Sequence, residues 1–338
     1  MPVERGNYRG LSGSRQRDVA DEMPGCYLPA VGETGPELLD VLGAGAEAEP
    51  ERDLGWVWSA YQAARDAGAA PFAAAVLTAS RVDRLGLAFA AGYPAALQQL
   101  SPGTRLPCAL CVTEDEGTHP RAMKTTLERV GGRDELNGTK TFVTFGNLAK
   151  DLLVAAKVGE KPDGRPDLAL VRIPADRAGV TLEVHPPTPF APEIPHARLE
   201  LRHVQVRAGE RLPGDGFTEY VKPFRTVEDI HVLGAALGYL VGVTRRANGP
   251  VQLLADFGAA LVALDWLRGV PPLDPRTHVV LQGVYQRVVE LAEGDELAAV
   301  WESTSEDERD RWRRDRPLLD VAFRARRARF ERATRELS

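Results

Sequence analysis

The stretch CALCVTEDEGTHPRAMKTTLERVGGRDELNGTKTFVTFG, residues 108–146, decides the fold. Runs rich in β-branched and aromatic residues flank Asn137-Gly138, a dipeptide that tolerates the positive φ angles of a tight hairpin turn. We therefore expect antiparallel sheet here, with a turn at this dipeptide. Hydroxyls at Thr113, Thr118 and Thr144 fall at expected strand ends or in the adjacent turn, where they can donate to the polar edge of a ligand. Threonine is also a favoured strand residue, so a single one of these threonines does not indicate a ligand site. The three together do.

The segments on either side of this stretch have a different periodicity. Between residues 36 and 100, apolar residues recur on one face, as in helices; the expected helices are 37–46, 54–68, 70–92 and 93–100. Alternating strands are expected at 151–159, 168–175, 180–185 and 197–206, with a hairpin turn at 163–167. Helical patterns return at 218–248, 251–269 and 277–294. The chain is thus expected to divide into an N-terminal arm, a helical domain, a β domain and a second helical domain, at 1–22, 23–107, 108–217 and 218–338.

Composition indicates an ordinary globular protein. A chain of 338 residues with 43% hydrophobic content can bury a sizeable core. The net charge of -6 disfavours nucleic-acid binding, because neutralising phosphates requires a concentrated basic surface. No apolar run approaches the roughly 20 residues that cross a bilayer, and the polar start lacks the apolar core of a secretory signal. We therefore expect a cytoplasmic protein with no membrane contact.

Cys108 and Cys111 form a C-x-x-C motif, one of several uses of paired cysteines. Such a pair can be a redox pair or half of a zinc site, but no second pair or suitably spaced histidines accompany it. Both cysteines fall in an apolar strand, where a free cysteine usually behaves as a small buried hydrophobe. We favour that interpretation and expect no metal site.

The same stretch resembles the β-rich middle domain of flavin-binding acyl-CoA dehydrogenases. That domain opens with a V-T-E strand, followed by a G-S-D-like turn, an L-N-G-x-K segment and a W-I-T-N-G strand end. The matching segments here are 112–114, 117–119, 136–140 and 142–146. Residues 203–217 resemble the segment that closes the domain, where Leu212, Gly214, Gly216 and Phe217 keep the pattern.

The resemblance implies an α+β fold: an N-terminal helical domain, a middle antiparallel β domain and a C-terminal helical bundle. It implies FAD as cofactor and an acyl-CoA or other acyl thioester as substrate. It places Val112, Thr113, Thr118, Phe142 and Thr144 at the flavin, with Phe142 in place of the family's tryptophan. It also implies an oligomer, homomeric or with another acyl-CoA dehydrogenase-like chain, because the family builds its flavin site across a subunit interface.

The resemblance also suggests a catalytic base. Most relatives carry the proton-abstracting glutamate late in the chain, in a Y-E-G-T motif that this sequence lacks. A minority, similar to isovaleryl-CoA dehydrogenase, carry it on the first C-terminal helix, ten residues before a glycine. Glu228 lies ten residues before Gly238 and is our candidate base, although a glutamate near a helix start is also a common solvated or dipole-pairing residue.

Two further positions near this helix bear on the site. Asp229 stands where the family has arginine; we assign it, with Thr118, to the substrate side and expect it to raise the proton affinity of its neighbour by like-charge repulsion. The family's diphosphate-binding arginine has no clear counterpart. Arg245 or Arg246 could replace it, or could simply complement the helix dipole.

The last 33 residues hold eleven arginines and eight carboxylates. Leu319, Phe323, Phe330 and Leu337 fall at helical spacing, which predicts an amphipathic helix packed on its own bundle or on a partner subunit.

Two functional classes fit these observations. The first is a FAD-dependent acyl-CoA dehydrogenase-like oxidoreductase that introduces an α,β double bond, with Glu228 as base. The alternative is a non-catalytic or half-site subunit of the same family, which assembles with a second member. The hydroxyl pattern and the register of Glu228 favour the enzyme, whereas the missing late glutamate and diphosphate arginine favour the half-site subunit.

Overall fold

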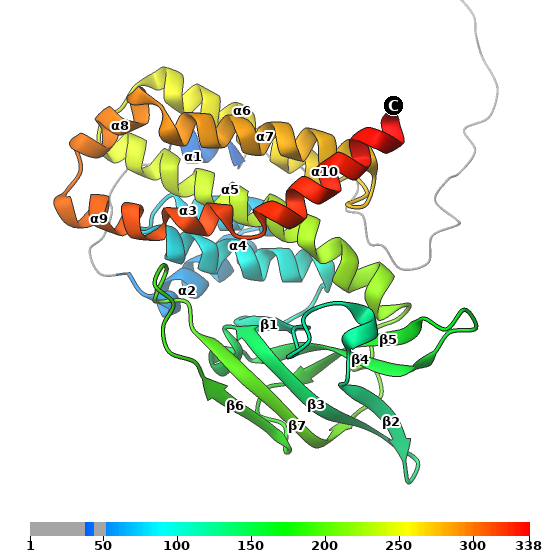
Figure 1. Cartoon of the computed structure of the whole chain (residues 1–338). Coiled ribbons are helices and arrows are strands. Elements are labelled where there is room, and N and C mark those ends of the chain that lie inside the picture. Colours follow the sequence, from blue (N-terminus) through cyan, green and yellow to red (C-terminus); the bar gives the residue numbers. More distant parts are fainter. Residues whose placement is uncertain (1–37, 44–51) are drawn as a thin grey trace, which may run out of the picture.

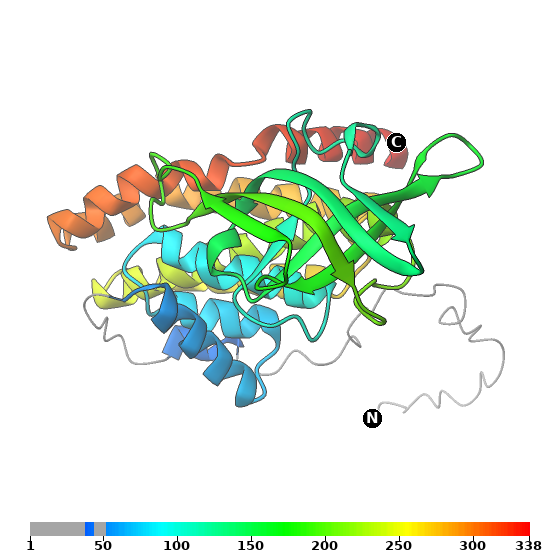
Figure 2. The same ribbon diagram turned by 90° about the horizontal axis from the view of Figure 1, so that it is seen from below.

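The computed structural model describes residues 38–43 and 52–338, so the expected N-terminal arm at 1–22 lies outside the described residues. A layer of helices stacks on one face of a seven-stranded sheet (Figure 1). Viewed from below, the sheet lies in front of the helices, and the last two helices run along one edge (Figure 2). The order of helices, sheet and helices is the one expected from the sequence.

The N-terminal helices are α1 (Asp40–Gly43), α2 (Leu54–Asp66), α3 (Pro71–Ala79) and α4 (Leu85–Leu100). The predicted break between residues 92 and 93 is wrong: α4 runs through Gly92 and Pro94, and the break lies at 80–84. Gly92 serves helix packing, because a Cβ there would come within 2.8 Å of the main-chain oxygen of His231. In the sequence alone, a glycine that lets two helices pack close together cannot be distinguished from a glycine that ends a helix.

The sheet contains β1 (Cys108–Cys111), β2 (Thr126–Val130), β3 (Arg133–Thr144), β4 (Asp151–Glu160), β5 (Pro166–Pro174), β6 (Val180–Val184) and β7 (His196–Val206). The strand order is β1-β4-β2-β3-β7-β6, with β5 paired to β4. Pairing is antiparallel except where β1 and β2 run parallel to β4. The four strands predicted after residue 150 and the turn between β4 and β5 are confirmed.

The hairpin turn is not at Asn137-Gly138, where the sequence placed it. Gly131 and Gly132, both with positive φ, connect β2 to β3, and Asn137-Gly138 lies inside β3 at a register shift. A Cβ on Gly138 would be 2.6 Å from the Thr125 Cα, so glycine is required by a close approach of the two segments. Positive φ is needed at bulges as well as at turns, and the dipeptide alone does not distinguish them.

Both faces of the central strand β4 are buried. Leu153 and Ala155 pack against the helices, whereas Leu152 and Val154 belong to a second core on the opposite side of the sheet. This explains why the strand reads as a continuous apolar run rather than an alternating one.

The C-x-x-C cysteines occupy the strand β1 and are fully buried, Cys108 in the core beneath the helices and Cys111 in the second core. Burial raises the pKa of both thiols, that of Cys111 to about 12. Their placement agrees with the prediction that they act as small buried hydrophobes, because a thiol at that pKa carries almost no thiolate near neutral pH.

The C-terminal part begins with a π-helical turn, η5 (Gly216–Val221), and continues into α5 (Lys222–Arg246). The remaining helices are α6 (Val251–Arg268), α7 (Pro275–Glu293), α8 (Asp295–Glu302), α9 (Glu306–Asp315), the 3₁₀ turn η6 (Arg316–Asp320) and α10 (Phe323–Leu337). The helix spanning Gly216–Arg246 is long and apolar enough to cross a membrane, but 89% of its apolar window is buried inside the protein. It is the central core helix of the bundle.

The final helix does not pack through the predicted apolar stripe. Leu319 is buried but belongs to η6, and Ala322 then adopts a left-handed conformation that resets the helical register. Consequently Phe323 and Leu337 are about half exposed, at 45% and 53%. The helix instead buries Arg326, whose guanidinium carbon lies 3.4 Å from the centroid of the Tyr285 ring on α7.

Candidate active-site cavity

A buried ion pair shapes the loop that follows β1. Lys140, fully buried on β3, donates to Glu114 Oε1 at 2.8 Å, and the same carboxylate accepts from the Thr125 hydroxyl at 2.6 Å and from the main-chain N–H of Lys124 at 2.7 Å. Burial acts to raise the pKa of Glu114, but these hydrogen bonds outweigh it and hold the pKa below its usual value. The glutamate and lysine of the two sequence motifs therefore close the loop 112–125 against β3.

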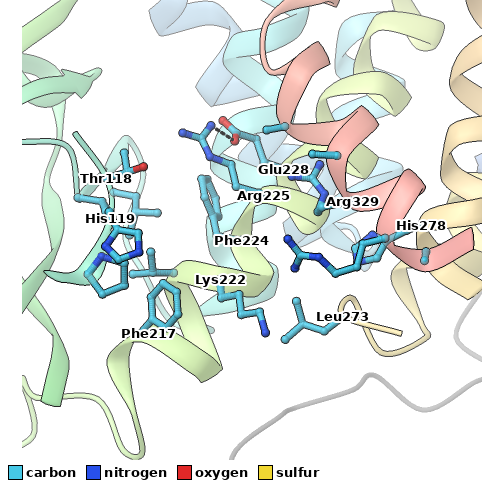
Figure 3. Close-up of a pocket in the computed structure, with 18 of the residues that line it drawn as sticks. Thr118, His119, Phe217, Lys222, Phe224, Arg225, Glu228, Leu273, His278 and Arg329 are labelled. Atoms are coloured by element: carbon cyan, nitrogen blue, oxygen red, sulfur yellow. Dashed lines mark hydrogen bonds and ion pairs between the residues drawn. The ribbon is translucent and has the colours of Figure 1, made fainter. Parts of the chain in front are cut away.

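The closed loop forms one side of a cavity of about 760 Å³. The first turns of α5 form its floor, and α7 and α10 form the opposite side (Figure 3). The lining residues that carry the argument are Thr118, Thr144, Lys222, Arg225, Glu228 and Arg332. A volume of this size lies within the roughly 300–1,000 Å³ of small-molecule and cofactor sites.

The structure brings four of the seven predicted site residues to this cavity: Val112, Thr118, Thr144 and Glu228. The hydroxyls of Thr118 and Thr144 make no hydrogen bond to another described residue, so both can serve a ligand. They come from the closed loop and from the end of β3, at the sequence positions where the resemblance placed the flavin contacts.

Thr113, Phe142 and Asp229 do not line the cavity. The main-chain oxygen of Thr113 accepts from the Thr141 N–H at 2.8 Å, which bonds the end of β1 to β3. Phe142 points away and stacks on His196, with ring centroids 4.1 Å apart. Its expected position against a flavin ring is therefore not found. A register shift in β3 between Lys140 and Val143 interrupts the regular alternation, so Phe142 and Thr144 do not share a face although they are two residues apart.

Glu228 lies on the cavity side of α5, with its side chain 16% exposed. Its Oε2 accepts from the Arg225 guanidinium at 3.1 Å (Figure 3). Burial raises the pKa of Glu228 to about 7; Arg225 and Arg329 act to lower it, and Asp229 adds to the increase. The expected like-charge effect of Asp229 therefore has the predicted direction, but burial is the larger cause.

Asp229 lies on the next face of α5, where it contacts α10. One of its carboxylate oxygens pairs with Arg326 at 3.4 Å and the other with Arg329. The expectation that Asp229 contacts substrate is corrected here: this buried carboxylate attaches the C-terminal helix to the core. Through this attachment α10 becomes a wall of the cavity.

Sequence reasoning missed the cationic side chains of the site. Arg225 could have been found, because it lies three residues before Glu228 on a predicted helix and must share its face. Lys222 lies one turn earlier on the same helix (Figure 3). Arg329 and Arg332 carried no signal, since nothing local shows that a helix about 100 residues downstream closes the cavity.

The arginines at the C-terminus of α5 are used elsewhere in the chain. Arg245 donates to the main-chain oxygen of Val41 at 3.1 Å, and Arg246 pairs with Glu308 at 2.7 Å. Both bind other helices of the chain, so neither is placed to act at this cavity.

Comparison with known proteins identifies the architecture. Residues 109–204 match the family model "Acyl-CoA dehydrogenase, middle domain". The fold resembles butyryl-CoA dehydrogenase from Megasphaera elsdenii, with a TM-score of 0.59 and 18% identity over 88% of each chain. The chain has an acyl-CoA dehydrogenase-like fold, and the match to that family's middle domain is confined to residues 109–204.

Other proteins share the acyl-CoA dehydrogenase-like fold at similar distance. An acyl-CoA dehydrogenase from Geobacillus kaustophilus gives a TM-score of 0.57 and 16% identity, covering 88% of this chain and 92% of that one. The prolyl acyl carrier protein oxidase AnaB gives a TM-score of 0.58 and 17% identity, covering 82% and 89%. No curated protein matches the sequence. The more specific resemblance to isovaleryl-CoA dehydrogenase, which rests on the register of Glu228, stays a prediction.

Proposed function

We propose that this protein is a FAD-dependent oxidoreductase that introduces an α,β double bond into an acyl thioester, with Glu228 as the proton-abstracting base. The observation that carries the proposal is the position of Glu228 in the same cavity as Thr118 and Thr144. A carboxyl group with a pKa of about 7 is well matched to general-base work near neutral pH.

The cavity residues fit a flavin edge. Thr118 and Thr144 offer two hydroxyls that no described residue occupies, and both come from the family-matched β domain. Bound FAD would supply the acceptor for the hydride that leaves the β carbon. Departure of that hydride makes loss of the α proton productive. Of the two carboxylates that line the cavity, Glu228 is less exposed than Glu336 and is held by Arg225, so it is the one that can take this proton.

The proposal is tested by measuring flavin absorbance and its loss on reduction by substrate. The purified protein, incubated with excess FAD and then desalted, should keep flavin absorbance, and an acyl-CoA substrate should bleach it under anaerobic conditions. Glu228→Gln should still bind FAD but lose bleaching by about 10²-fold or more. Glu331→Gln, an exposed carboxylate on α10, is the matched control and should bleach normally. Normal bleaching in Glu228→Gln would remove this residue from the mechanism.

The half-site alternative is favoured by one specific observation. Thr113 and Phe142, two of the expected flavin contacts, do not line the cavity. A subunit that completes its site with a second family member would show no flavin absorbance by itself and would acquire it on mixing with that partner. Flavin retention by the isolated chain would exclude this alternative.

We also propose that the protein is an oligomer. Val251, Val262 and Trp266 on α6 and Val280 on α7 are exposed apolar side chains on neighbouring helices. Such a surface is typical of a subunit interface. Sedimentation should give a mass well above the 36.7 kDa of one chain, and a monomer at micromolar concentration would contradict the proposal.

A further inference from the structure

We infer that Lys222 and Arg332 form a subsite of the cavity that binds the phosphate group of a ligand. The inference rests on the proposed function, which it deepens: both a flavin dinucleotide and the carrier of an acyl thioester contain phosphate. The relevant residues come from two helices that are far apart in sequence, the start of α5 and the middle of α10.

The cavity carries more positive than negative side chains. Four cationic side chains line the cavity, namely Lys222, Arg225, Arg329 and Arg332, against two carboxylates, Glu228 and Glu336. The protein as a whole has a net charge of -6, so this excess of positive charge is local. A cationic cavity in an acidic protein attracts anionic ligands.

Two of the four cationic side chains are already paired with carboxylates of the chain. Arg225 is bonded to Glu228, and Arg329 to the buried carboxylate of Asp229. Lys222 and Arg332 form no hydrogen bond or ion pair through their side chains with any residue that the structure describes. Lys222 and Arg332 are exposed. Glu336, one turn beyond Arg332, is exposed too and likewise pairs with no described residue. Two charged donors therefore remain for a ligand.

The pKa of a neighbouring histidine, His278, is affected by the same positive charges. His278 on α7 also lines the cavity, and its Nδ1 is buried without a hydrogen-bond partner among the described residues. Its pKa is lowered to about 4, first by burial and then by Arg329 and Arg332. A neutral His278 leaves Lys222 and Arg332 as the groups able to compensate ligand charge.

Shape also permits a bulky oxyanion. On the cavity face of α10, Ala325 and Ala328 precede Arg332, so small side chains leave room on that wall. Lysine supplies a compact point charge and arginine a planar fork that fits two oxygens of one phosphate.

The test measures binding of three probes to the full-length protein: inorganic pyrophosphate, FAD and CoA. The variants are Lys222→Gln, Arg332→Gln and the double variant. Arg335→Gln is the matched control, because it removes an exposed arginine of the same helix that does not line the cavity. Each cation should contribute roughly tenfold in affinity for the phosphate-bearing ligand, as expected for a charge-assisted hydrogen bond.

The expected result is weaker binding of pyrophosphate by the double variant, with Arg335→Gln unchanged. The FAD and CoA arms then identify the source: weakening of FAD alone assigns the subsite to the cofactor, and weakening of CoA alone assigns it to the thioester carrier. Unchanged affinities for all three probes, or no binding of any probe by the unmodified protein, would overturn the inference. Loss of flavin bleaching with intact phosphate binding would instead remove the proposed activity and leave the subsite.

Discussion

Replacing Glu228 by glutamine should stabilise the protein at neutral and alkaline pH. Burial raises the pKa of Glu228 from its ordinary 4.5 to about 7. Below about pH 4.5 the carboxyl group is protonated in the native and unfolded states alike, and it causes no difference. Between pH 4.5 and 7 the unfolded chain releases this proton before the native protein does, so the native state becomes relatively less stable. Above pH 7 the full penalty is about 3 kcal/mol.

Glutamine keeps the shape and cannot ionise, so Glu228→Gln should escape this penalty. For a chain of 338 residues, about 3 kcal/mol corresponds to a rise in melting temperature of roughly 4 °C. The assay is thermal unfolding of the apo protein in matched buffers from pH 4.5 to pH 8.5. The difference between variant and unmodified protein should be near zero at pH 4.5 and should increase to its full value by about pH 7.

The control is Glu331→Gln, which removes an exposed carboxylate from an i,i+4 pair with Arg327. Its effect should be small and nearly independent of pH. A Glu228→Gln variant that is less stable than the unmodified protein at pH 8 would refute the reasoning. It would mean that Arg225 stabilises the ionised carboxylate by more than burial penalises it.

Three other predictions follow from the same contacts. If Glu228 is the base, kcat/KM should rise with pH through an inflection near pH 7 and level off above it. Arg225→Gln should move that inflection to higher pH, because Arg225 lowers the pKa of Glu228. Lys140→Met should lower the free energy of unfolding in urea by about 3–5 kcal/mol, with partial recovery when Glu114→Gln is added, because the single variant leaves a buried carboxylate unpaired. Asp229→Asn should speed trypsin cleavage within residues 316–332 severalfold, whereas an unchanged cleavage rate would show that Asp229 does not hold α10.

Much of the architecture could be predicted from local patterns. Strands β4 to β7 and helices α5 to α7 lie where periodicity placed them, because alternation and helical repeats depend on which face of each element is buried. The candidate site was predicted in part, since Thr118, Thr144 and Glu228 share one cavity. The position of the hairpin turn was predicted less reliably. Asn137-Gly138 has the sequence typical of a hairpin turn, but Gly138 is instead needed where β3 passes close to Thr125.

The sequence by itself determined the order of the elements, the resemblance of the β domain to a known middle domain and the helix that carries the candidate base. Tertiary structure alone decided the surroundings of that base. It paired Asp229 with Arg326 and Arg329, and it brought Arg332 into the cavity from a helix about 100 residues downstream. The physical reason is that periodicity records which residues of one element share a face. Charges, burial and pKa values are set instead by the elements packed against that face, and no local pattern in the sequence specifies them.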